Sequence, residues 1–460
     1  MYSNNRKIEE VENSLMSAIG IEGEPIAKAN ILQQMERYGI PGCSIAVINH
    51  GDIEWAKAYG DAKKGSPLTT DTLFQTGSFS KSISALASLI LVHEGLLDLT
   101  KDINTQLQSW KIPDTPYTTV NKVALQHLLS HTSGCNILAF EGYPNTALLP
   151  SLRQILEGQG PAINPPIHIG AIPGSSVSYS GGGYVVVQQL IEDATGLGFP
   201  SFVENRVFKP LNMQSSTFHD PLENWACGHV DAGRILEGGF RHYPEAAASG
   251  LWSTPSDFAK FLIYLQNALL KKSNDSLIPK KLLDLMITPL IFPFGLGLVV
   301  DGENENFEIN HRGRTCGYTC GFVLFPHLKQ GAVIMTNADN ANLLISEIFR
   351  SLADVYEWPS QGIKIKTKTA LSHNTLNRYL GKYVLPNRSS EATIFKEKNS
   401  LIIQAGSGST HELHAEESNR FFIIENGFEV LFLEEHGEIS GLILTMQKGV
   451  EKHFIKFQPQ

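Results

Sequence analysis

Alternating apolar and polar positions predict a β-hairpin near the start of the chain and a buried helix soon after it. Residues 43–49 and 53–59 are rich in β-branched and aromatic side chains, and they flank His50-Gly51-Asp52. That combination is typical of two strands joined by a tight turn. From Lys81 the segment SISALASLILVHEG has an apolar stripe at helical spacing. Gly95 is a suitable residue for the C-terminal end of that helix.

A further helix is predicted near the N-terminus, and the middle of the chain, from about residue 85 to 290, is predicted to be mostly helical and loop-like. Apolar residues recur at helical spacing near the N-terminus and predict an amphipathic helix that contains Ile8, Val11, Leu15 and Ile19. Between about residues 85 and 290 the clearest helices are PSFVENRVFKPL and TPSDFAKFLIYLQNALL. The second follows Ser253-Thr254-Pro255, which supplies a capping residue and a proline for the first turn.

Strand patterns return after the helical middle. Residues 294–300, 319–325 and 331–336 are predicted strands, and ANLLISEIFRSLADVYEW is predicted to form a closing helix. Strands at both ends of a helical insertion favour one mixed-order antiparallel sheet built from distant parts of the chain. We therefore expect an α/β (α+β) fold in which helices flank the sheet and a mostly helical subdomain is inserted.

The composition changes again after about residue 360. The segment QGIKIKTKTALSHN is polar and is predicted to be a linker. Short β-rich runs then recur about every ten residues, which predicts a small antiparallel β-barrel. The expected domains are an N-terminal helical extension over residues 1–24, a main domain over 25–360 and the barrel over 372–460. The runs are ATIF, SLIIQ, RFFII, EVLFLEE, GLILTM and HFIKF.

Length and charge narrow the classes of function. The chain has 460 residues, of which 42% are hydrophobic, and its net charge is −9. An acidic chain without a Lys/Arg block is unsuited to nucleic acid or an anionic membrane. No apolar run reaches the roughly 18 residues that span a bilayer. The N-terminus has no signal-peptide pattern, so we expect a cytoplasmic protein.

The cysteines favour neither a disulfide scaffold nor a zinc site. There are five of them, an odd number, and the spacings are wide. Cys316 and Cys320 form a C-x-x-x-C pattern, but no second cysteine pair accompanies it and the histidines are scattered. We expect no metal and no organic cofactor.

The stretch TGSFSKSI contains Ser78 and Lys81 in the only S-x-x-K pattern of the chain. Residues three apart lie on one face of a helix, so the lysine amine would lie beside the serine hydroxyl. A neutral lysine would activate that hydroxyl as a nucleophile. Neutrality near pH 7 requires burial or cationic neighbours to lower the lysine pKa by about 3 units, equivalent to about 4 kcal/mol. The alternative is that Ser78 only caps the helix.

Two further segments carry candidate site residues. Tyr179 lies two residues before Gly181-Gly182-Gly183, where the backbone can approach another surface closely. A phosphate loop is disfavoured because no Gly-Lys-Ser/Thr sequence follows. His311-Arg312-Gly313-Arg314 is predicted to be a glycine-containing strand edge that binds a carboxylate or stabilises an oxyanion. A core tyrosine and a solvated strand edge are the structural alternatives.

In this order, Ser78-x-x-Lys81, Tyr179-Ser-Gly181 and His311-x-Gly313 resemble the penicillin-recognising serine hydrolases. That superfamily includes class C β-lactamases, D-alanyl-D-alanine carboxypeptidases, D-aminopeptidases and related esterases. The resemblance covers about residues 25–360 and includes YGIPGCSIAVINHG, HLLSHTSG, HEGLLDLTKDI and AAASGLWSTPSDFAKFL. The tail, with RYLGKYVLP, resembles the lipocalin-like barrel that some members carry.

The resemblance implies roles for individual residues. Ser78 matches the acylated nucleophile, Lys81 the lysine that activates it, and Tyr179 the tyrosine that transfers protons. The backbone N–H groups of Ser78 and Arg314 match the oxyanion hole. The residues implied in substrate binding are Gly181, His311, Arg312 and Gly313.

Two positions depart from the pattern of the superfamily. Gly181 replaces its usual asparagine, and His311 replaces the lysine of the β-lactamases. Both changes weaken the case for β-lactam hydrolysis. Arg312 or Arg314 would replace some of the missing positive charge if it pointed into the cleft. His131 and His229 lie in segments typical of the superfamily and are interpreted as structural.

The expected function is cleavage of a small ester or a D-amino-acid peptide through an acyl-enzyme on Ser78. A β-lactamase or D,D-carboxypeptidase is the first alternative, and a non-catalytic binding or regulatory relative is the second. The expected partner is a small-molecule or peptide substrate. For the barrel three roles are open: covering the cleft, forming a homo-oligomer, or binding a separate ligand.

Overall fold

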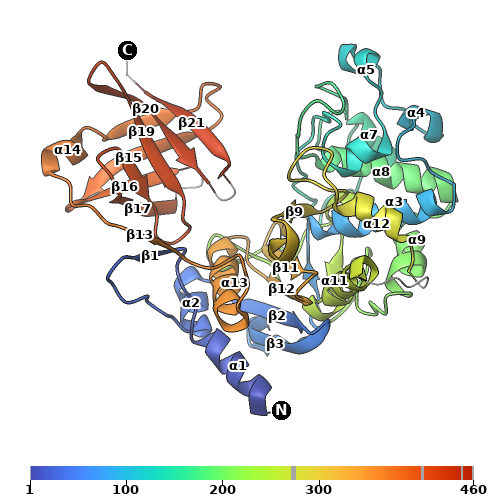
Figure 1. The fold of residues 1–460 in the computed structure, drawn as a ribbon. Helices are drawn as coiled ribbons and strands as arrows, with labels where there is room; N and C mark the ends of the chain where they lie inside the picture. The colour runs from blue at the N-terminus through green and yellow to red at the C-terminus, as the bar shows by residue number, and fades with distance from the viewer. Residues whose placement is uncertain (1, 271–275, 406–408, 447–448, 458–460) are drawn as a thin grey trace. The chain divides into compact units, whose positions relative to one another are not determined.

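The computed structural model describes residues 2–270, 276–405, 409–446 and 449–457, which divide into two compact units (Figure 1). One unit consists of residues 32–345. The other consists of the residues up to 31 together with those from 346 onward. The domain boundaries expected from the sequence differ from this division and stay a prediction.

A seven-stranded antiparallel sheet forms the framework of the first unit, in the order β4-β3-β2-β12-β11-β10-β9. β12 pairs with β2, Thr336 lying opposite Cys43, so the sheet joins distant parts of the chain as expected. The predicted hairpin is confirmed, and its turn residues His50 and Gly51 both have positive φ angles, as such tight turns require. The strands are β2 Gly42–Asn49, β3 Asp52–Lys63, β4 Ser66–Pro67, β9 Val299–Asp301, β10 Glu308–Thr315, β11 Tyr318–Phe325 and β12 Gln330–Thr336.

The strand predicted over residues 294–300 is wrong for most of its length, because β9 begins only at Val299. The backbone N–H of Leu296 donates to Met286, and that of Gly297 donates to Leu129, so neither bonds to a strand. A Cβ on Gly297 would lie 2.7 Å from the Lys81 carbonyl oxygen. The segment therefore packs as irregular backbone against the helix that carries Lys81.

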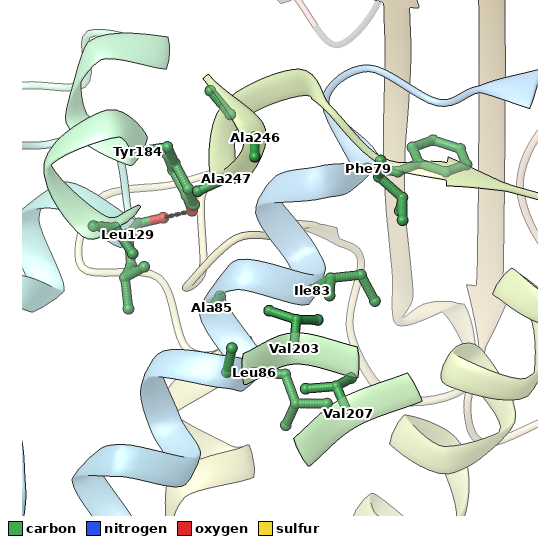
Figure 2. Close-up of a cluster of buried hydrophobic side chains, with 14 of the residues drawn as sticks. Phe79, Ile83, Ala85, Leu86, Leu129, Tyr184, Val203, Val207, Ala246 and Ala247 are labelled. Atoms are coloured by element: carbon green, nitrogen blue, oxygen red, sulfur yellow. Dashed lines mark hydrogen bonds between the residues drawn. The ribbon is translucent and has the colours of Figure 1, made fainter. Parts of the chain in front are cut away.

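That helix, α3 (Phe79–His93), is buried on all sides rather than along one stripe. It packs against α8 (Gly181–Thr195) and α10 (Ala246–Ser249), and Figure 2 shows Phe79, Ile83 and Leu86 among the surrounding apolar side chains. Its serines are compatible with burial because their hydroxyls donate to backbone carbonyls. The pairs are Ser80 with Gly77, Ser82 with Gly297, Ser84 with Ser80 and Ala247, and Ser88 with Ser84.

The predicted helices of the middle region are confirmed. TPSDFAKFLIYLQNALL forms α11 (Pro255–Leu270), which packs on β2 and β12, and PSFVENRVFKPL forms α9 with the π-helix η1. The remaining helices are α2 Ile31–Tyr38, α4 Ile103–Gln106, α5 Pro116–Val120, α6 Leu125–Leu129, α7 Leu152–Glu157, α9 Phe199–Val203, η1 Glu204–Phe208, α12 Lys280–Ile287 and η2 Asn304–Asn306. Short strand pairs are β5 Phe74–Gln75 with β8 Trp252–Ser253, and β6 His229–Val230 with β7 Arg234–Ile235.

In the second unit the N-terminal helix is shorter than predicted. α1 spans Tyr2–Glu12, whereas Leu15 bridges to Ala29 and Ile19 lies in a strand. That strand, β1 (Ile19–Ile21), pairs in parallel with β13 (Lys364–Lys366). The segment interpreted as a linker therefore contains a paired strand. The predicted closing helix is α13 (Asn342–Tyr356), and the hydroxyl of its Ser351 lies 2.7 Å from that of Ser14.

Eight antiparallel strands close into the expected barrel (Figure 1). β21 pairs with β14, which removes both sheet edges. Tyr383, Phe432 and Leu442 are buried in its apolar core. Two of its strands, β14 and β17, had no counterpart among the predicted β-rich runs. The barrel contains β14 Gly381–Val384, β15 Glu391–Glu397, β16 Ser400–Ala405, β17 Ser409–Ala415, β18 Arg420–Phe422, β19 Glu429–Glu435, β20 Glu438–Thr445 and β21 Glu451–Lys456; α14 His373–Asn377 precedes it.

Candidate active site

The Ser78 hydroxyl lies between the side chains of Lys81 and Tyr179. Ser78 occupies the cap position of α3, but its hydroxyl makes no capping hydrogen bond. The N–H groups of Phe79, Ser80 and Lys81 instead donate to the carbonyls of Thr76, Gly77 and Ser78. The Ser78 Oγ atom lies 3.2 Å from Lys81 Nζ and accepts a 2.8 Å hydrogen bond from the Tyr179 hydroxyl. The hydroxyl is therefore positioned for chemistry rather than for capping.

Lys81 is buried in a way that suits a base. Its side chain is 2% exposed, and its Nζ donates a 2.7 Å hydrogen bond to the Ala248 carbonyl. Burial lowers the pKa of Lys81 to about 7. A large fraction of the amine is therefore neutral near pH 7. The neutral amine can donate one N–H to Ala248 and direct its lone pair at Ser78 Oγ.

Tyr179 is held as a protonated phenol. Burial raises its pKa above the ordinary value for tyrosine, although its hydrogen bond to Ser78 opposes this shift. The ring of His131 stacks on the Tyr179 ring, with centroids 4.1 Å apart. His131 Nδ1 accepts a 3.1 Å hydrogen bond from the Ser180 N–H. These contacts position Tyr179, which agrees with the structural interpretation of His131.

The three glycines after Tyr179 form the first turn of α8, and the first two of them, Gly181 and Gly182, lie beneath residues 135–140. Ser180 caps this turn, because its hydroxyl accepts from the Gly183 N–H. A Cβ on Gly182 would lie 3.0 Å from both Cys135 Sγ and Ile137 Cβ. The close approach predicted from the glycines is therefore between two segments of this chain. Covered in this way, the turn does not resemble a phosphate loop.

Two glycines bring β10 against the turn that precedes Ser78. A Cβ on Gly313 would lie 2.0 Å from the Thr76 carbonyl oxygen. A Cβ on Gly77 would lie 2.8 Å from the backbone nitrogen of Arg314. Only glycine permits such approaches, and Gly77 also has a φ of +54°. The Arg314 backbone consequently lies against Gly77, the residue directly before Ser78.

His311, which belongs to β10, is buried and uncharged. Its Nδ1 atom donates a 2.7 Å hydrogen bond to the Arg312 carbonyl. Burial lowers the pKa of His311 to about 4, and the nearby charge of Lys81 acts in the same direction. His311 therefore supplies no positive charge at neutral pH, in contrast to a lysine at that position.

A cavity of about 680 Å³ opens over Ser78. Of the residues predicted for the site it is lined by Ser78, Tyr179, Arg312, Gly313 and Arg314. Lys81, Gly181 and His311 do not line it. The lining residues that sequence reasoning missed are Ala139, Phe140, Glu141, Arg241, Tyr243, Thr315, Cys316, Asp339 and Asn342.

For two of these residues, Arg241 and Tyr243, the sequence contained a signal, namely their nearness to a segment typical of the superfamily. Arg241 and Tyr243 lie five and three residues before the AAASGLWS segment, which supplies the Ala248 carbonyl to Lys81. The Tyr243 hydroxyl accepts from the Cys316 N–H and donates to the Glu141 carbonyl, so it connects the two walls of the cavity.

No described group of three or more His, Cys, Asp and Glu side chains is arranged to hold a metal ion. All five cysteines are free thiols. His229 is buried, and its Nδ1 lies 3.0 Å from the Asn337 carbonyl oxygen. Within the described parts of the chain, no helix is both long and apolar enough to cross a bilayer.

The sequence as a whole places these residues in a known class. A family profile described as "Beta-lactamase" matches residues 27–355, and the chain belongs to this family. The expected superfamily and fold are therefore confirmed.

Individual relatives extend the comparison. Penicillin-binding protein 4* of Bacillus subtilis strain 168 is 24% identical over 441 residues, covering 88% of this chain and 93% of the relative. A putative D-alanyl-D-alanine carboxypeptidase of Escherichia coli K12 is 27% identical over 253 residues, covering 50% of this chain and 57% of the relative. The octameric penicillin-binding protein homologue from Pyrococcus abyssi has a TM-score of 0.61 at 21% identity, covering 93% of this chain and 98% of that structure.

Proposed function

We propose that this chain is a serine hydrolase that cleaves an ester or amide through an acyl-enzyme on Ser78. The observation that carries the proposal is the placement of one serine oxygen within hydrogen-bonding reach of a buried lysine amine and a protonated tyrosine. Membership of the β-lactamase family supports a hydrolase of this class.

In the first half of the reaction neutral Lys81 takes the Ser78 proton, and Ser78 Oγ attacks the substrate carbonyl carbon. The oxyanion is stabilised by the backbone N–H groups of Ser78 and Arg314. As the bond to the leaving group breaks, Tyr179 donates its proton to that group and regains one from Lys81. Both side chains contact the same oxygen, which provides the path for this proton.

In the second half a water molecule attacks the acyl carbonyl carbon, and the Tyr179 hydroxyl relays the water proton to neutral Lys81. As the bond from that carbon to Ser78 Oγ breaks, Lys81 returns the proton to the serine oxygen and the acid product leaves. Apart from the attacking water, every acid, base and nucleophile in this cycle is a side chain of the chain itself.

The substrate class we propose is a small ester or a D-amino-acid peptide. The name of the Escherichia coli relative favours a second candidate, a D,D-carboxypeptidase activity, and the description of the family is consistent with a β-lactamase activity. Efficient β-lactam hydrolysis is disfavoured because His311 is uncharged and therefore does not replace the positive charge of the β-lactamase lysine. Self-association and a cytoplasmic location stay predictions, the first supported by the octameric state of the Pyrococcus abyssi homologue.

Labelling with a fluorophosphonate tests the proposed nucleophile. We expect intact-mass measurement to find one adduct on the full-length protein and none on Ser78→Ala, because only an activated serine attacks phosphorus at a useful rate. A folded wild-type protein that acquires no adduct would contradict the proposal and favour a binding or regulatory role.

The pH dependence of activity tests the role of Lys81. Because its base form predominates only above its pKa of about 7, we expect kcat/KM to rise as the pH increases through about 7. The measurement is kcat/KM for a neutral ester between pH 5 and 9, since this parameter reports the free enzyme. A flat profile, or a fall across this interval, would show that a neutral Lys81 is not the base.

A further inference from the structure

The cavity wall formed by residues 139 and 140 is apolar. Ala139 and Phe140 line the same cavity as Ser78 and Tyr179. The carbonyls just before them are already bonded to α8, because Leu138 accepts from the Gly181 N–H and Ile137 accepts from the Gly182 N–H. The side chains that residues 139 and 140 add to the cavity lining are a methyl group and an aromatic ring.

The backbone carbonyl of the next residue in the loop, Glu141, is also hydrogen-bonded. The Glu141 carbonyl accepts from the Tyr243 hydroxyl, and that hydroxyl accepts from the Cys316 N–H. The Glu141 side chain is exposed and is the one charged group that residues 139–141 add to the cavity lining.

Gly181 allows the Phe140 ring to occupy its position. A Cβ on Gly181 would lie 3.2 and 3.3 Å from two ring carbons of Phe140 and 3.2 Å from the Leu138 carbonyl oxygen. Contacts this short require a neighbour to move. The ring thus lies over the first turn of α8, two residues after Tyr179, where a residue with a Cβ would shift it or its neighbours by a few tenths of an ångström.

We propose that Phe140 determines the specificity of the site by binding an apolar alkyl or aryl group of the substrate beside the reacting carbonyl. The inference rests on the proposed acyl-enzyme activity and adds a substrate class to it. Each methylene group buried against the ring should increase kcat/KM by about two- to fourfold. The apolar group belongs either to the acyl part or to the leaving alcohol, and two ester series separate these sources.

The experiment uses the full-length protein. The first series varies the acyl group and contains p-nitrophenyl acetate, butyrate and hexanoate. The second series varies the alcohol and contains methyl, butyl and hexyl acetate, whose hydrolysis is measured by the release of acid. For wild type we expect kcat/KM to be at least about 16-fold higher for the longest than for the shortest ester in one of the series. In Phe140→Ala this ratio should fall about tenfold.

Two further variants complete the test. Leu138→Ala is the matched control, because Leu138 belongs to the same loop and is 64% exposed but does not line the cavity; its ratios should match those of wild type. Gly181→Ala keeps Phe140 in the chain but shifts its ring or its neighbours by a few tenths of an ångström, so the ratio should fall by a smaller factor. This variant also covers the case in which Phe140→Ala fails to fold.

The outcomes separate this inference from the proposed function. If wild type forms the fluorophosphonate adduct and cleaves esters, but Phe140→Ala and Gly181→Ala keep the wild-type ratios in both series, the specificity role is overturned while the hydrolase stands. A wild type that prefers the shortest ester in both series also overturns it. If the folded wild type forms no adduct, the proposed function fails, and the inference that rests on it fails with it.

Discussion

Replacing Ser78 with alanine is expected to reduce kcat by about 10⁴- to 10⁶-fold. The hydroxyl is the atom that forms the acyl-enzyme, and no neighbouring group can take over that bond. The Ser78 backbone has φ −64° and ψ −8°, which alanine adopts without strain, and the hydroxyl makes no capping bond that the helix would lose. Steady-state kinetics on an ester should show the loss, while the thermal unfolding midpoint should shift by only a few degrees.

A matched control for this variant is Ser88→Ala on the same helix. The Ser88 hydroxyl is buried and donates to the Ser84 carbonyl, and Ser88 does not line the cavity. We expect Ser88→Ala to keep turnover within a fewfold of wild type. If Ser78→Ala retained more than a tenth of wild-type turnover, Ser78 would not be the nucleophile.

Replacing Tyr179 with phenylalanine is expected to lower kcat by about 10²- to 10⁴-fold, the range for loss of one positioned acid or base. The phenylalanine ring can keep the stacking on His131, so the variant removes the hydroxyl with little change in packing. Lys81 and Ser78 remain in contact, and acylation by a fluorophosphonate should be slowed less than turnover of an ester with a poor leaving group. Comparing p-nitrophenyl and alkyl esters of one acid measures this difference.

The control for Tyr179→Phe is Tyr184→Phe. Tyr184 is a fully buried tyrosine five residues along the same segment, and its hydroxyl donates to the Leu129 carbonyl (Figure 2). Its loss should lower the free energy of unfolding by about 1–3 kcal/mol, because a buried carbonyl loses its partner, with little effect on kcat. Equal kinetic losses in the two variants would mean that Tyr179 acts through packing and not through proton transfer.

Much of the fold could be predicted from local patterns. The hairpin of β2 and β3, the start and end of α3 and the recurrence of short strands in the barrel all depend on residues close in sequence. The prediction over residues 294–300 was wrong because an apolar run with glycines suits a strand as well as irregular backbone packed on a helix. Gly297 decides between them only through its contacts with Lys81 and Ala85, which periodicity does not contain.

The roles of the conspicuous glycines and histidines also needed the structure. Gly181 was expected to contact substrate, yet it lies beneath Phe140 and outside the cavity lining. His311 was expected in substrate binding, but it is buried with its Nδ1–H bonded to the Arg312 carbonyl. A motif identifies which residue types recur together, whereas burial and hydrogen bonding decide which atoms reach the substrate.

The sequence by itself determined the family, the order of the candidate residues Ser78, Lys81 and Tyr179, and the spacing that places Lys81 one helical turn from Ser78. Only the tertiary structure decided that Tyr179, 101 residues away, donates to the same serine oxygen. It also decided that Lys81 is buried deeply enough for its pKa to fall to about 7. The physical reason is that helical spacing is a local property of the backbone, while desolvation and long-range contacts arise only when α3, α8 and β10 pack together.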